Sequence, residues 1–273
     1  MTASALPILM YHHVSPAPGL VTVTPKNFVA QMAWLAANDY HTASCADLEG
    51  FLQGRPLPQR TVMITFDDGY LDNYVHAFPI LRQYGLHAVI FAVTDWIGDG
   101  AARPHPVAGE SGAPLLLNHN ACTERIREGR ADEAIVRWSE VECMRAAGSF
   151  EFQSHTASHT RWDKISGNAA EKSTALGRDL ERSRETLRQR LGMLGTHLCW
   201  PQGYFDADYL SVARDQGFTH LYTTTPGSLR PDGDANKLPR IVVKDKGAAW
   251  FSSRIHLYSS PFLARWYGRL KGI

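Results

Sequence analysis

Short apolar runs alternate along the chain with segments in which apolar residues recur at helical spacing. The short runs predict buried strands, whereas a spacing of three or four residues predicts helices with one apolar face. Strands are predicted at residues 6–11, 62–66, 87–93, 150–153, 197–200, 219–223 and 240–243, and helices at 28–37, 74–84, 123–136, 139–147 and 169–191. Strands that alternate with helices indicate an α/β fold with a parallel sheet or barrel.

Two segments depart from this alternation. Residues 98–120 are rich in Gly, Pro and Ala and predict a long insertion loop, which we expect to cover a substrate groove. Residues 247–273 form a basic and aromatic extension, which suits a peripheral contact with an anionic membrane or the closing wall of a barrel. Because Pro261 interrupts any single long amphipathic helix there, the barrel wall or a partner surface is favoured.

The composition narrows the classes of function. With 44% hydrophobic and 20% charged residues the chain can bury a core, and its net charge of +1 gives no basic face for nucleic acid. The four scattered cysteines form no C-x-x-C pair, so neither a zinc ribbon nor a redox pair is indicated. No apolar run approaches the roughly 18 residues of a membrane span, and the first residues lack a signal-peptide pattern, so a cytoplasmic location is expected.

Polar residues of ligand type follow several predicted strands. In parallel α/β folds the carboxyl ends of the strands share one edge of the sheet, and active residues gather there. We therefore expect these side chains to lie near one another. They are His12, His13, Asp67, Asp68, Thr94, Asp95, Trp96, His155, His159, Gln202 and Tyr204.

Two short motifs within this group suggest metal chemistry. In SHTASH, His155 and His159 are four residues apart, which places both on one face of a helical turn. Two histidines and one carboxylate form a facial ligand set with open positions. In TFDDGY, one of the adjacent carboxylates Asp67 and Asp68 would bind the ion while the other takes a proton from the attacking water. Taken singly, the motifs also fit ordinary helix-surface histidines and a helix cap.

Together, TFDDGY and SHTASH resemble the polysaccharide deacetylase family (carbohydrate esterase family four, the chitooligosaccharide deacetylase homology domain) over about residues 7–243. The resemblance implies a distorted (β/α) barrel with about seven parallel strands and a single catalytic domain over residues 1–273. It implies Asp67 as the catalytic base, and Asp68, His155 and His159 as ligands of one divalent ion. Zinc suits this mixed set first, although cobalt, nickel and iron also fit.

The chain departs from the family pattern in its third and last motifs. Cys-Trp-Pro-Gln at 199–202 replaces Arg-x-Pro-aromatic, so the main chain of Gln202 is the expected oxyanion donor. Arg240, in LPRIVV, is the candidate for the missing arginine that orients the base, and it is also counted among the substrate-binding residues. His256, in RIHLYS, is the candidate general acid. These departures, with ILMYHHVS, resemble the subgroup that deacetylates poly-β-1,6-N-acetylglucosamine.

The remaining candidates concern substrate. His12 is expected either to contact Asp67 or substrate, or to be a satisfied core histidine. Tyr204, Trp138 and Trp96 would stack on a sugar ring or belong to the core. The expected function is metal-dependent hydrolysis of N-acetyl groups from an N-acetylated sugar or glycan, releasing acetate. The alternatives are an amidohydrolase of the same fold that opens a non-sugar amide, and an inactive glycan-binding homologue.

Overall fold

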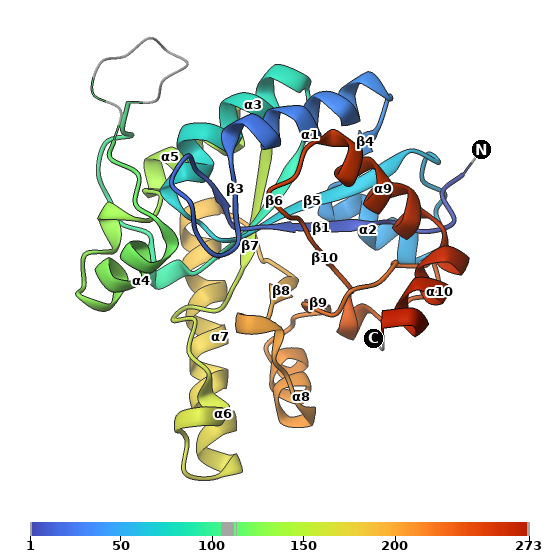
Figure 1. Ribbon diagram of the computed structural model, residues 1–273. Helices are drawn as coiled ribbons and strands as arrows, with labels where there is room; N and C mark the ends of the chain where they lie inside the picture. Colours follow the sequence, from blue (N-terminus) through green and yellow to red (C-terminus); the bar gives the residue numbers. More distant parts are fainter. Residues whose placement is uncertain (1, 105–111, 113, 272–273) are drawn as a thin grey trace.

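The strands form one curved parallel sheet. The structure, a computed structural model, describes residues 2–104, 112 and 114–271. The strand order is β10-β1-β5-β6-β7-β8-β9, every pair is parallel, and β4 pairs with the start of β5 (Figure 1). The strands are β1 Ile8–Tyr11, β4 His41–Thr42, β5 Thr61–Asp68, β6 Ala88–Ala92, β7 Phe150–Ser154, β8 His197–Cys199, β9 His220–Tyr222 and β10 Ile241–Val242, with β2 His13–Val14 and β3 Thr22–Val23 in a separate pair. This confirms the predicted distorted (β/α) barrel with about seven strands.

The central strand β5 is buried along its whole length. Its apolar run packs on both faces, as the continuous hydrophobic pattern of a parallel strand requires. The strand is longer than predicted, because Asp67 and Asp68 continue its pairing with Phe91 and Ala92 of β6. Both carboxylates are therefore fixed by the sheet and do not belong to a flexible turn.

Helices cover the sheet on its outer side. Figure 1 shows α1 and α3 lying together along one face, while α7 and α8 pack on each other beside β7, β8 and β9. The helices are α1 Pro25–Ala37, α2 Cys45–Leu52, α3 Phe78–Tyr84, α4 His119–Arg127, α5 Trp138–Ala146, α6 Trp162–Ile165, α7 Ala169–Leu191, α8 Ala207–Asp215, α9 Ala248–Ser259 and α10 Pro261–Lys271.

The prediction of a helix at 123–136 is wrong about both the first and the last residue of the helix. The observed helix α4 begins four residues earlier, where the Asn118 side chain accepts a hydrogen bond from the backbone of Ala121. It ends before Gly129, whose φ of 75° is left-handed, and only a short 3-10 turn, Ala131–Glu133, follows. The predicted insertion loop at 98–120 lies partly outside the described residues, so its proposed role as a cover over a groove stays a prediction.

The C-terminal extension divides into two helices. Helix α9 packs against α1 and buries Phe251, Ile255 and Tyr258, as expected of a closing wall of the barrel. Helix α10 begins at Pro261, directly after Ser260, the C-cap of α9, so the chain breaks where the proline predicted. Its large apolar side chains are mostly exposed, among them Phe262 at 74% and Trp266 at 58%. Within the described residues, none of the helices combines the length and hydropathy needed to cross a bilayer.

Candidate active site

The predicted chemical residues meet at the carboxyl edge of the sheet. Asp67 and Asp68 end β5, His155 follows β7 directly, and His12 lies between β1 and β2. Hydrogen bonds lock the edge in place: the backbone N–H of His155 donates to the carbonyl of Ala92 at the end of β6. The site is therefore built by strand ends whose positions the sheet dictates.

The two histidines of SHTASH do not lie on a helical turn, which corrects the prediction. The segment is a loop in which Thr156 and His159 take left-handed φ values of 68° and 58°. The Thr156 hydroxyl accepts a hydrogen bond from the His159 backbone, and this holds the reversal. The loop brings the imidazole rings of His155 and His159 within 4.9 Å, centroid to centroid.

Backbone strain is concentrated at this edge. Besides the two loop residues, Asp68 has a φ of 73° and Gln202 a φ of 57°. A non-glycine residue in this region costs on the order of 1–3 kcal/mol, and such residues persist where the surroundings fix them, often at functional sites. The strain at Asp68 turns its carboxylate toward His155 and His159.

Asp68, His155 and His159 form a cluster suited to a metal ion. Oδ1 of Asp68 lies 3.4 Å from Nε2 of His155 and 3.6 Å from Nε2 of His159. This oxygen is buried and has no hydrogen-bond partner within the described part of the chain. A buried carboxylate oxygen without a partner is unfavourable, so a cation between these three groups would resolve it. The donor set of two imidazoles and one carboxylate suits zinc.

The supporting contacts fit the same interpretation. Nδ1 of His155 lies 2.8 Å from the carbonyl oxygen of Cys199, which fixes the proton on Nδ1 and leaves the Nε2 lone pair toward Asp68. Burial lowers the pKa of His159 to about 4, so this imidazole is in its neutral, ligating form near pH 7. Burial alone would raise the pKa of Asp68, but the nearby imidazoles of His155 and His159 hold it well below its usual range.

Asp67 is held by Arg240, which is fully buried. Nη1 of Arg240 lies 2.6 Å from Oδ1 of Asp67, and Nη2 lies 2.8 Å from Oδ2. Burial would raise the pKa of Asp67, but the charge and hydrogen bonds of Arg240 lower it overall, so the carboxylate is ionised at neutral pH. Asp67 thus has a cationic partner for each oxygen, whereas Oδ1 of Asp68 has none within the described part of the chain, which makes Asp68 the better placed carboxylate for a cation.

The tandem histidines face in different directions. His12 faces the site, with Nε2 3.8 Å from Oδ2 of Asp67, and burial lowers its pKa. His13 faces the other way: its Nδ1 bonds Asp72 at 2.5 Å and its ring stacks on Tyr70. The expected contact between His12 and Asp67 is therefore present, and His13 is the satisfied interior histidine.

Gln202 and Tyr204 stand at the rim of the same edge. Gln202 follows Pro201 in the 3-10 turn after β8, and its side-chain carbonyl accepts a hydrogen bond from Arg161. The guanidinium of Arg161 lies 3.8 Å from the ring centroid of Tyr204. Trp96 is also near, with its ring 5.3 Å from that of His159.

The positions of three predicted site residues differ from what their predicted roles require. His256 lies on α9, where its Nδ1 contacts the carbonyl of Ser252. It lines a hollow together with residues 59–60, which directly precede β5, so it lies at the amino end of that strand, whereas Asp67 and Asp68 lie at the carboxyl end. Trp138 is buried in the core, with the guanidinium of Arg190 5.4 Å from its ring. Arg240 binds both oxygens of Asp67, the contact expected of an arginine that orients this carboxylate, but its complete burial argues against direct contact with substrate.

Some neighbours of the site were not predicted. Sγ of Cys199 lies 3.0 Å from Nη2 of Arg240 and 3.7 Å from Oδ2 of Asp67. Tyr70 is buried beside the site, and burial together with the charge of Asp68 raises its pKa. His119, on α4, contacts Nε2 of His13 at 3.2 Å. Cys199 stands where the third motif of the resembled family has its arginine, and this position could have indicated that the cysteine lies near Asp67. Nothing in the sequence indicated His119.

The Arg240–Asp67 pair gives a prediction about stability. Arg240→Met should lower the free energy of unfolding by about 3–5 kcal/mol at neutral pH, because it leaves a buried carboxylate without a partner. The pKa of Asp67 is lowered in the folded chain, so the pair stabilises above the unfolded pKa of about 3.9 and this contribution fades in acid. Urea unfolding of the variant, the parent and Arg240→Met/Asp67→Asn should show the loss shrinking at low pH and in the double variant. An equal loss at all pH values in both variants would contradict this account.

Comparison with known proteins finds relatives over most of the chain. The chain is 28% identical over 239 residues to YxkH of Bacillus subtilis, which is named as a polysaccharide deacetylase, covering 87% of this chain and 71% of that protein. It is 24% identical over 228 residues to the poly-β-1,6-N-acetyl-D-glucosamine N-deacetylase of Staphylococcus epidermidis, covering 82% of this chain and 68% of that protein.

The fold is also similar to that of a solved structure, the Streptococcus pyogenes deacetylase PplD in complex with acetate. The TM-score is 0.72 at 21% identity, and the match covers 95% of this chain and all of that one. The sequence profile described as polysaccharide deacetylase matches residues 54–221, a span that contains both carboxylates of β5 and both histidines of the loop. With more than half of its length matched by that profile, and with the strand ends arranged as described, the chain belongs to the polysaccharide deacetylase family of carbohydrate deacetylases.

Proposed function

We propose that this protein is a metal-dependent N-deacetylase that hydrolyses the acetamide of an N-acetylated sugar or glycan and releases acetate. The observation that carries the proposal is the division of labour between adjacent carboxylates: Arg240 occupies Asp67, while Asp68 faces two imidazoles with an unpartnered oxygen. An inactive glycan-binding homologue would have no need to keep a strained and buried arrangement of this kind.

For the substrate, the relatives suggest glycans of N-acetylglucosamine. The Staphylococcus epidermidis protein is named for the poly-β-1,6-linked polymer. The rings of Trp96 and Tyr204 near the histidine loop and Gln202 suit the faces of a sugar. We therefore propose β-1,6-linked N-acetylglucosamine oligomers as the first substrates to test, with other N-acetylated sugars and a non-sugar acetamide beside them.

Asp68, His155 and His159 would hold one divalent ion, for which zinc is the first candidate. When bound, such an ion polarises a carbonyl and lowers the pKa of a neighbouring water from 15.7 to about 7. That acidity matters here, because Asp67 has a lowered pKa and is a weak base.

In this proposal, side chains and one backbone N–H of the protein each have a separate role in catalysis. Asp67, oriented by Arg240, takes a proton from the water that attacks the acetyl carbon. The main-chain N–H of Gln202 is proposed to donate to the oxygen on which negative charge develops. As the C–N bond breaks, the leaving nitrogen requires a proton. The proton that Asp67 accepted balances this step, and His12, whose Nε2 lies 3.8 Å from Oδ2 of Asp67, is the imidazole placed to pass it on; His12 replaces His256 in this proposed role.

The two carboxylates should respond differently to substitution. Asp67→Asn should keep the metal and lose about 10²–10⁴-fold in kcat, because an amide cannot accept the proton. Asp68→Asn should lose metal, and excess zinc should partly restore its turnover. Acetate release and metal content, measured on both variants across a zinc titration, check this. Rescue of Asp67→Asn rather than Asp68→Asn by zinc would mean that the roles are reversed, and acetate release from no tested amide by the parent would contradict the proposed function.

A matched pair of histidine variants tests the proton donor. His12→Ala should lower kcat by about 10²–10⁴-fold with metal content unchanged, since the imidazole beside Asp67 is removed and the ligands are kept. His256→Ala, at an exposed position on α9, should leave kcat within about twofold, as expected of a surface substitution. Steady-state acetate release by the two proteins under the same conditions gives the comparison. A large loss in His256→Ala, with His12→Ala active, would restore the first assignment.

A further inference from the structure

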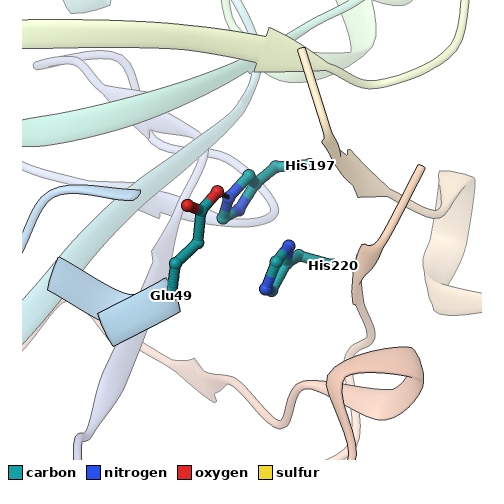
Figure 2. Close-up of side chains that lie close together, drawn as sticks. All are labelled: Glu49, His197 and His220. Atoms are coloured by element: carbon teal, nitrogen blue, oxygen red, sulfur yellow. Dashed lines mark hydrogen bonds and ion pairs between the residues drawn. The ribbon is translucent and has the colours of Figure 1, made fainter. Parts of the chain in front are cut away.

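A second histidine cluster lies at the other end of the sheet. His197 and His220 are the first residues of β8 and β9, and they are partners in the register of that parallel pair. Side chains in register on neighbouring strands project from the same face. Glu49 reaches them from α2, as Figure 2 shows. The proposed catalytic residues lie after the carboxyl ends of these strands, so this cluster at the amino ends is a separate site.

The contacts within the cluster orient both imidazoles. Nε2 of His197 lies 2.9 Å from Oε1 of Glu49, and Nδ1 of His197 lies 2.8 Å from the Tyr222 hydroxyl. Nδ1 of His220 lies 2.9 Å from the Thr219 hydroxyl. In each histidine, therefore, Nδ1 meets a hydroxyl oxygen to which it can donate. This is the supporting contact that metal-ligating histidines usually have, and it leaves Nε2 as the ligand atom.

We propose that Glu49, His197 and His220 bind a second divalent cation of zinc type. Ligand atoms of the three residues all lie within 4.8 Å of one another. A tetrahedral zinc ion with bonds of about 2.0–2.2 Å holds its ligands roughly 3.3–3.6 Å apart. To bind one ion, His220 has to move inward, and the contact of 2.9 Å between His197 and Glu49 has to open slightly. Two nitrogens and one carboxylate oxygen are a preferred zinc donor set, and water completes it on the side where Glu49 is exposed.

The stacked rings of His197 and His220 have to turn relative to each other before both can bind one ion. The rings of His197 and His220 now stack at 4.5 Å with an interplanar angle of 12°, and parallel rings do not aim two lone pairs at one point. His197 is fully buried, whereas His220 is only partly buried, so His220 is the ring that turns.

The position of the cluster suggests what such an ion does. β8 is joined to β7 at a single registered position, Ser154 with Leu198, so the last two strands are weakly attached to the sheet. An ion held by Glu49 of α2 and by the first residues of β8 and β9 would link these two strands to α2. It is a structural ion, and the inference does not depend on the proposed deacetylase function.

Metal stoichiometry tests the inference directly. Metal-free protein is titrated with Zn²⁺ against a chromophoric chelator, and bound zinc is confirmed by elemental analysis. The parent should bind two ions per chain, and Glu49→Gln and His220→Ala should each bind one. Glu49→Gln keeps the size of a partly exposed side chain, which makes it the variant least prone to misfold. His41→Ala, a half-exposed histidine on β4, is the matched control and should bind two ions.

A second readout isolates this site from the catalytic one. In an Asp68→Asn background, Zn²⁺ should still raise Tm, because an ion that binds only the folded chain stabilises it. Adding Glu49→Gln to that background should abolish the rise. A folded Glu49→Gln protein that binds as many ions as the parent would overturn the proposal, as would a zinc-dependent Tm rise that survives in the Asp68→Asn/Glu49→Gln chain.

Discussion

Arg240 and Asp67 form a two-point ion pair in the interior of the barrel, with Arg240 entirely removed from water. Removing two charges from water is unfavourable, and only good geometry with further hydrogen bonds offsets it. Arg240 satisfies this condition by also donating to the carbonyl of Thr223 and to the Thr65 hydroxyl. The pair joins the end of β5 to the start of β10, so one interaction both fixes the position of Asp67, the proposed base, and links two strands of the sheet.

The other half of the site follows from that pairing. With both oxygens of Asp67 occupied, the chain reverses at Asp68 into a left-handed conformation, and its carboxylate faces the histidine loop. The loop contains two further left-handed residues, Thr156 and His159, held by side-chain to main-chain hydrogen bonds. Folding energy from the buried strands therefore maintains local conformations that none of these residues would prefer by itself.

Much of this arrangement could be predicted from the sequence, because strand ends carry it. Apolar runs located β1, β5, β6 and β7, and the rule that active residues follow parallel strands placed Asp67, Asp68 and His155 correctly. The spacing of the histidines was right but the helix was not, since spacing does not reveal a backbone reversal at Thr156. His256 was misplaced because position along the chain does not say which end of the sheet α9 covers.

The partners in the central ion pair are 173 residues apart in the sequence. Contacts at such separation form late, because the entropy of closing a long loop has to be overcome before they add stability. During synthesis, Asp67 and most of the sheet leave the ribosome well before Arg240 does. Until then the carboxylate has no guanidinium, and an early closed core would trap an unpaired charge. The interior around Asp67 is therefore completed only by the last part of the sheet to be synthesised, which supplies Arg240 just before β10.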